Sequence, residues 1–227
     1  MIYKNIKPAK FISRPNRFIA NIEIDGNHEI CHVKNTGRCR EFLIEGAKIF
    51  VQEFDSSATR KTKYDLISAY KKEQLINMDS QVTNKVIQEW LQEGCLFENI
   101  SLIKPESKYK NSRFDFYVEV GKRKIYIEVK GVTLEEDGVV MFPDAPTERG
   151  VKHLRELEEC IEEGFEAYVI FVIQMSDVKV FKANEEMHKA FAETLTRVHE
   201  KGVNVLAYEC LVTENSIRIS KQVPVIV

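Results

Sequence analysis

Asp115, Glu128 and Lys130 are the side chains of this 227-residue sequence that are best placed to do chemistry. They lie in RFDFYVEVGKRKIYIEVKG (113–131), which alternates as two strands joined by a turn at Gly121-Lys122. With that two-residue turn, Asp115 falls opposite Glu128. The Cβ atoms of such a pair are ~4.5–5.5 Å apart, so two carboxylates repel there unless a proton or cation lies between them.

The chemistry that this arrangement would support is the cleavage of a phosphodiester. A hard cation such as Mg²⁺ or Mn²⁺ prefers oxygen ligands, and we expect Asp115, Glu128 and the Val129 carbonyl to hold it. The cation would activate water, while the Lys130 ammonium would stabilise the attacking or developing anion. Two further carboxylates are candidates for this metal site: Glu89 and Glu106.

An alternative interpretation of the same hairpin needs no chemistry. Its charged face could be exposed, with cross-strand ion pairs between Arg113 and Glu128 and between Asp115 and Lys130. Periodicity alone leaves the two interpretations level.

Residues 79–227 have the pattern of an α/β domain that would position these side chains. A helical stripe begins at Val82 and is closed by Gly94. The nearly all-apolar segment 167–175 is typical of a strand buried on both faces. The remaining elements that we expect are strands at 101–107, 113–120 and 124–131, a loop over 133–146, helices at 147–163 and 184–201, and strands at 204–210 and 216–220.

Polar side chains share one face of the helix expected from Thr147. They are Arg149, Lys152, His153 and Glu156, opposite an apolar stripe. This face either is solvated or leans over the hairpin, where it would contact phosphate.

Residues 1–78 read as a small all-β domain, for which an OB-like β-barrel is one candidate. Strand patterns occur at 17–24, 28–33, 47–54 and 63–72, and Asp25-Gly26-Asn27 is a turn signal. Cations interleave with aromatic residues, as in domains that hold single-stranded nucleic acid. The candidate nucleic-acid contacts of the whole chain are Arg14, Arg17, Lys34, Arg38, Arg40, Lys63, Arg113, Arg149, Lys152 and His153.

Composition and charge narrow the class of protein. The net charge is −2, but residues 1–80 carry 14 Lys+Arg against 10 Asp+Glu, a bias compatible with a polyanionic partner. Five cysteines without C-x-x-C spacing indicate reduced thiols rather than disulfides or zinc. No apolar run approaches the ~20 residues that span a bilayer, and the N-terminus has no apolar signal region. We therefore expect a cytoplasmic protein without a membrane partner.

Asp115 followed by Glu128-Val129-Lys130 resembles the PD-(D/E)XK nuclease signature, although Phe114 stands where that signature has proline. More of the chain resembles the sugar fermentation stimulation protein A (SfsA) family. The matching segments are HVKNTGRCREFL (32–43), RKTKYDL (60–66), SRFDF (112–116), YIEVKGVTL (126–134) and FPDAPTERGVKHLREL (142–157). This resemblance implies an OB-like β-barrel over 1–78 and a restriction-endonuclease-like mixed sheet flanked by helices over 79–227. It also implies DNA binding, a regulatory role in sugar use, and a nuclease site at the three motif positions.

Three functional hypotheses follow. The first is a Mg²⁺- or Mn²⁺-dependent phosphodiesterase that acts on DNA. The second is a DNA-binding regulator of sugar metabolism genes whose nuclease-like domain does not cut, and the third is a protein-binding scaffold. The sequence leaves open DNA or RNA, single or double strands, and the oligomeric state, with a homodimer as one option.

Overall fold

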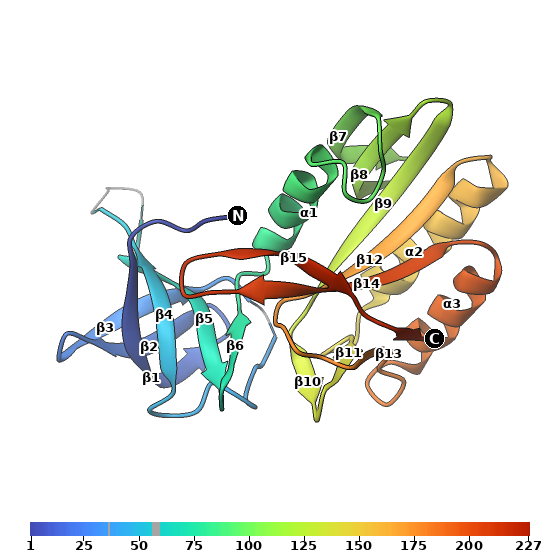
Figure 1. Ribbon diagram of the computed structural model, residues 1–227. Helices are drawn as coiled ribbons and strands as arrows, with labels where there is room; N and C mark the ends of the chain where they lie inside the picture. The colour runs from blue at the N-terminus through green and yellow to red at the C-terminus, as the bar shows by residue number, and fades with distance from the viewer. Residues whose placement is uncertain (36, 56–59) are drawn as a thin grey trace.

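The alternating N-terminal sequence folds into a closed β-barrel (Figure 1). In the computed structural model, which describes residues 1–35, 37–55 and 60–227, six strands form its sheet. They are β1 (Ile6–Asn16), β2 (Ile19–Ile24), β3 (Asn27–Val33), β4 (Lys48–Glu53), β5 (Tyr64–Lys71) and β6 (Gln74–Asn77). The order is β3-β2-β1-β4-β5-β6, and parallel pairing of β3 with β5 closes the barrel. The predicted OB-like barrel is confirmed.

Strand β1 had no counterpart among the strands expected from the sequence. Pro8 and Pro15 interrupt its pattern, and proline has no N–H to donate to a ladder. Pro15 lies where the register with β2 shifts, between Ser13 and Asn16, whereas Pro8 precedes the pairing with β2, which begins at Lys10, and pairs with Phe50 of β4.

The C-terminal half is built on a mixed sheet in the order β15-β14-β12-β9-β8-β7, with helices on both faces. Its parallel strands β9, β12 and β14 lie at the centre. Helices α2 and α3 pack against each other on one face, and α1 packs against β7, β9 and β15. The mixed sheet flanked by helices is confirmed. The elements are α1 (Val82–Gln92), β7 (Ile100–Tyr109), β8 (Ser112–Val120), β9 (Arg123–Val132), β10 (Leu134–Glu136), β11 (Val139–Phe142), α2 (Glu148–Glu162), β12 (Glu166–Ile173), β13 (Val180–Ala183), α3 (Lys189–Glu200), β14 (Asn204–Val212), β15 (Ile217–Gln222) and β16 (Val225–Ile226).

The segment 133–146, expected to be a loop, contains strands β10 and β11. They form a hairpin around Asp137-Gly138, whose φ values of 50° and 87° suit a tight turn. Strand β11 also pairs in parallel with β13, which makes a second, four-stranded sheet with β16 within the described residues. Contacts with residues about 40 positions further along stabilise these short strands, so local pattern was insufficient to predict them.

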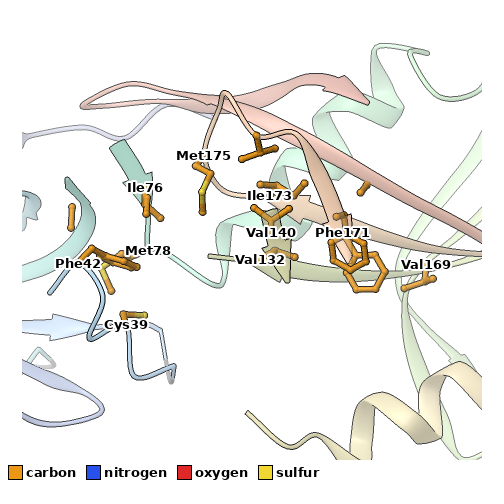
Figure 2. Packing of buried hydrophobic residues seen from close by; sticks show 14 of the residues in the cluster. Cys39, Phe42, Ile76, Met78, Val132, Val140, Val169, Phe171, Ile173 and Met175 are labelled. Atoms are coloured by element: carbon orange, nitrogen blue, oxygen red, sulfur yellow. The ribbon is translucent and has the colours of Figure 1, made fainter. Parts of the chain in front are cut away.

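One apolar cluster runs from the barrel into the C-terminal half (Figure 2). It includes Phe42 and Met78 together with Val140 and Met175, all buried. The two halves therefore share a core. Within the described ranges, no helix is long and apolar enough to cross a bilayer.

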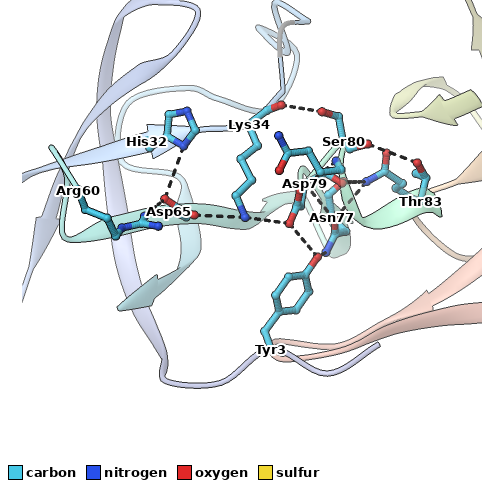
Figure 3. Close-up of polar contacts among 11 residues, drawn as sticks. Tyr3, His32, Lys34, Arg60, Asp65, Asn77, Asp79, Ser80 and Thr83 are labelled. Carbon is cyan, nitrogen blue, oxygen red and sulfur yellow. Dashed lines mark hydrogen bonds and ion pairs between the residues drawn. The ribbon is translucent and has the colours of Figure 1, made fainter. Parts of the chain in front are cut away.

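Gln174, at the end of β12, is the main polar link across this junction. Its side-chain Nε2 donates to the carbonyl oxygen and Oδ1 of Asn77, both at 3.1 Å, and to the Asp79 carbonyl oxygen at 3.0 Å. Its backbone carbonyl accepts from Asn77 N at 2.9 Å, and its backbone N–H donates to Val132. Figure 3 shows the adjoining ion pairs, in which Lys34 Nζ lies 3.2 Å from carboxylate oxygens of both Asp65 and Asp79.

Replacing Gln174 should therefore destabilise the whole chain. Gln174→Met keeps the length of the side chain but leaves buried oxygens of Asn77 and Asp79 without their donor, and we expect a loss of about 3 kcal/mol. Urea denaturation measures this, with the exposed Gln92→Met as control. Equal urea midpoints for the two variants would contradict the assigned role.

Candidate active site

The β8–β9 hairpin has the register predicted from the sequence. Its turn lies at Gly121-Lys122, and the backbone pairs continue as far as Phe116 with Ile127. One residue further, the Asp115 carboxylate meets β9 instead, because its Oδ2 accepts a hydrogen bond from Val129 N at 2.7 Å. The expected strand pairing at this position is thus replaced by a side-chain contact, which fixes the carboxylate against the neighbouring strand.

Asp115 is held from a second side by helix α1. Its Oδ1 accepts from Asn84 Nδ2 at 2.7 Å. Burial and the negative charge of Glu128 raise the pKa of Asp115 to about 6, although the hydrogen bonds from Val129 and Asn84 act to lower it. Sequence reasoning missed Asn84, and the only signal was a polar residue in the first turn of a helix expected to pack near the hairpin.

Glu128 is almost wholly buried, with 3% of its surface exposed. Lys130 Nζ and His153 Nδ1 each lie 2.5 Å from its Oε1. Burial alone would raise the pKa of Glu128, but the hydrogen bonds and charges of His153 and Lys130 outweigh it and lower the pKa. The other oxygen, Oε2, is buried and has no hydrogen-bond partner in the described part of the chain.

His153 lies under helix α2 rather than on its outer surface. It is 4% exposed, and Arg149 Nε donates to its Nε2 at 3.4 Å, which leaves the Nδ1 proton for Glu128. We predicted that His153 contacts nucleic acid, but in the structure its ring contacts the Glu128 carboxylate. The buried face of α2 is wider than its Val/Leu/Ile stripe, because it includes His153 and Glu156.

The donor set fits a hard cation held by few protein ligands. The orphaned Oε2 of Glu128 and the Asp115 carboxylate are oxygen donors of the kind that Mg²⁺ prefers. The N–H and C=O of one strand residue point to the same edge, so the Val129 carbonyl faces the side on which Asp115 lies. Among the described residues no group of three or more His, Cys, Asp or Glu is arranged to hold a metal ion, so water would complete the coordination of a cation at these two carboxylates.

The two supplementary carboxylates differ in position. Glu106 lies between the pairs Pro105↔Phe116 and Ser107↔Phe114, so its register position is opposite Asp115. Its side chain is 61% exposed and lies 3.6 Å from Arg113. Glu89 Oε2 lies 2.5 Å from the N-terminal nitrogen of Met1. This ion pair compensates the charge of the carboxylate without a metal.

A basic pocket of about 470 Å³ adjoins His153. Four cations line it, from the β7–β8 hairpin and from α2: Lys108, Arg113, Arg149 and Lys152. The structure thus gathers three predicted contacts, Arg113, Arg149 and Lys152, beside the carboxylates. Lys108 is an addition.

The Arg14 guanidinium binds backbone carbonyls of the barrel. Its Nη1 donates to the carbonyls of Gly37 (2.7 Å) and Arg38 (3.0 Å), and its Nη2 to those of Arg17 (2.8 Å) and Asn35 (2.5 Å). The guanidinium therefore ties a hairpin to a loop, which corrects its predicted role.

Lys34 needs the same correction, since its side chain is 17% exposed and bridges Asp65 and Asp79. Lys63 is half-exposed and pairs with Glu53 at 2.7 Å. Three predicted contacts of the barrel are exposed and make no side-chain ion pair or hydrogen bond to the described residues: Arg17, Arg38 and Arg40.

Without metal, Asp115→Asn should change how stability depends on pH. The pKa of this carboxyl is near 3.9 in the unfolded chain and about 6 in the folded one, so folding favours its protonated form. The free energy of unfolding of the wild type should therefore fall by on the order of 2–3 kcal/mol as pH rises from about 4 to about 6. The uncharged variant should lack this decline. Urea denaturation in EDTA between pH 4 and 8 measures it, with the exposed Asp137→Asn as control. A wild-type-like pH profile for Asp115→Asn would refute the assignment.

Known proteins match this chain over both halves. Residues 12–78 match the SfsA N-terminal OB domain, and residues 81–216 match the sugar fermentation stimulation protein RE domain. A sugar fermentation stimulation protein homolog of Clostridium beijerinckii is 62% identical over 226 residues, which cover 100% of both chains. A homolog of Desulfitobacterium hafniense is 60% identical over 96% of this chain and 94% of its own. A solved structure, Pyrococcus furiosus SfsA in complex with Ca²⁺, superposes with a TM-score of 0.90 at 27% identity and covers 100% of this chain and 98% of that one. This chain belongs to the sugar fermentation stimulation protein (SfsA) family.

Proposed function

We propose that this chain is a metal-dependent phosphodiesterase that acts on DNA, with Asp115 and Glu128 as the ligands of Mg²⁺ or Mn²⁺. The observation that carries the proposal is the buried Oε2 of Glu128, which lacks a partner among the described residues beside a second carboxylate of raised pKa. A divalent cation would compensate both. The Pyrococcus furiosus relative is described in complex with Ca²⁺, a cation that also takes oxygen ligands.

The residues around the carboxylates have distinct roles in this proposal. When bound, the cation supplies an activated water and neutralises negative charge. Asn84 and Val129 N–H hold the Asp115 carboxylate in place, and His153 fixes Glu128 through Oε1. Lys130 keeps its ammonium beside Glu128, where it would stabilise negative charge on the phosphate.

The proposed substrate is a nucleic acid because of the charge around the site. The basic pocket is lined by His153, which also contacts Glu128, and would take phosphates next to the cleaved one. Exposed Arg17, Arg38 and Arg40 add positive charge on the barrel. OB domains commonly bind strands through such surfaces.

A second candidate is a DNA-binding regulator that does not cut. Two observations favour it: the described residues offer fewer than three clustered metal-ligating side chains, and Lys130 is already paired with Glu128. The names of the relatives also concern stimulation of sugar fermentation rather than hydrolysis.

Lys130→Ala separates the two candidates. The change removes a charge without removing a large apolar group, so folding and DNA affinity should persist, while cleavage should fall by roughly 10²–10³. The measurement is the cleavage of labelled single- and double-stranded DNA in Mg²⁺, Mn²⁺ or EDTA, with binding followed separately. Asp115→Ala should abolish cleavage, and adding Lys130→Ala to it should cost little more.

Lys124→Ala, on an exposed part of the same strand, is the matched control and should cleave like the wild type. Equal cleavage by Lys130→Ala and the wild type would show that the mechanism is wrong. Binding without cleavage in every metal would establish the regulator instead.

The basic pocket predicts a particular dependence on salt. Each lost phosphate contact should reduce the slope of log K on log salt by about 1, so Arg149→Ala with Lys152→Ala should reduce it by about 2. Fluorescence anisotropy between 50 and 300 mM salt measures the slope. Arg218→Ala, an exposed cation of the opposite edge strand β15, should leave it unchanged. An unaltered slope in the double variant would place the phosphates elsewhere.

A further inference from the structure

A small polar pocket lies between the barrel and the C-terminal half, directly beyond Lys130 along β9. Its volume is about 150 Å³, and its lining includes Asn35 from the barrel and Gly131, Thr133 and Gln174 from the other half. This is more space than one bound water needs. Two pockets thus adjoin the Asp115–Glu128 site. The polar pocket includes Gly131, next to Lys130 on β9, and the basic pocket includes His153, which contacts Glu128.

Gly131 allows the close approach that shapes this pocket. A Cβ at this position would lie 2.7 Å from Gln174 Oε1 and 3.1 Å from Thr83 Cγ2. Because glycine has no side chain, Gln174 can lie over the backbone next to Lys130. The pocket thus begins one residue from the ammonium that we place at the phosphate.

Two largely buried residues with side-chain oxygens line the pocket. Gln174 is 1% exposed and Thr133 is 8% exposed. The Nε2 of Gln174 is fully engaged with the barrel, whereas its Oε1 and the Thr133 hydroxyl have no hydrogen-bond partner in the ranges that the structure describes. Both oxygens can therefore accept hydrogen bonds from a ligand in the pocket that carries donors.

The remaining lining defines the chemistry of that ligand. Asp144 contributes a carboxylate, and no Lys or Arg is among the described lining residues, so the pocket does not suit a phosphate. Leu134, Met141 and Phe142 add apolar surface. A flat aromatic ring that stacks on apolar groups through its faces and carries N–H groups along one edge matches these features, and a nucleobase is such a group.

We infer that this pocket holds the base of the nucleotide whose phosphate lies at Lys130. Guanine should be preferred, since its ring N–H and exocyclic amine present adjacent donors to the Asp144 carboxylate and Gln174 Oε1. A base held here is unpaired, so the substrate is single-stranded at this nucleotide or has it turned out of the duplex. The inference rests on the proposed action on nucleic acid.

The test uses binding without cleavage. The full chain in EDTA is titrated with oligothymidine that carries one central guanine, thymine or abasic nucleotide. The wild type should bind the guanine oligonucleotide about 10-fold more tightly than the abasic one, within the range for single base contacts. Asp144→Asn and Thr133→Val should each lose most of this preference and keep the affinity for the abasic oligonucleotide. Asp137→Asn, on the same β10–β11 hairpin but outside the pocket, should behave as the wild type.

A second measurement separates this inference from the proposed function. Guanosine 5′-monophosphate, but not ribose 5-phosphate, should shift the amide NMR signals of Gly131 and Thr133. Oligonucleotide binding with no base preference and unmoved signals would overturn the pocket and leave the phosphodiesterase standing. Shifted signals together with undiminished cleavage by Lys130→Ala would support the pocket and remove the proposed mechanism.

Discussion

A buried carboxylate must be compensated, and the arrangement around Glu128 follows from that requirement. An isolated ionised side chain would be very unfavourable at 3% exposure. Lys130 on the same strand and His153 on α2 share one of its oxygens, which leaves the other buried without a hydrogen-bond partner among the described residues. The same need brings α2 onto β9 through a histidine, and Arg149 and Lys152 of that helix line the adjoining basic pocket. A purely apolar contact between α2 and β9 would pack as well but would offer no ligand atom.

The barrel takes part in this site through its junction with the sheet. Gln174 directly follows β12, the strand that pairs with β9. Its side chain donates hydrogen bonds to the segment that connects the barrel to α1. Helix α1 then brings Asn84 to Asp115. A displacement of the barrel would therefore be felt at the Asp115 carboxylate through a short run of hydrogen-bonded residues. The barrel and the Asp115 carboxylate are in this way mechanically linked.

The parts of the site that sequence could predict are those set by local periodicity. Alternation and a two-residue turn were enough to place Asp115 near Glu128 and Lys130. The change in pattern near residue 79 indicated two domains, and the resemblance to a family added their OB-like and restriction-endonuclease-like folds. The role of His153 could not be read in the same way, because helical spacing gives the face of a residue but not the neighbour that covers it. Arg14 and Lys34 were misread for a related reason, since a cation that binds carbonyls or buried acids has the same sequence signature as an exposed one. The β10–β11 hairpin depended on pairing with β13, a contact between residues distant in the chain.

The four carbonyl contacts of Arg14 have a consequence for the entropy of recognition. They fasten the β1–β2 hairpin to the loop that carries Arg38, so the backbone beneath the exposed Arg17 and Arg38 is ordered when the chain folds. Ordering a loop residue on binding costs roughly 1–2 kcal/mol of conformational entropy. Here this backbone is already ordered in the folded chain, so binding does not incur that cost. Affinity for a polyanion can then arise from a modest number of cations, because only their side chains remain to be immobilised. Under the proposed function, a chain with a net charge of −2 would in this way still present an ordered cationic surface to DNA.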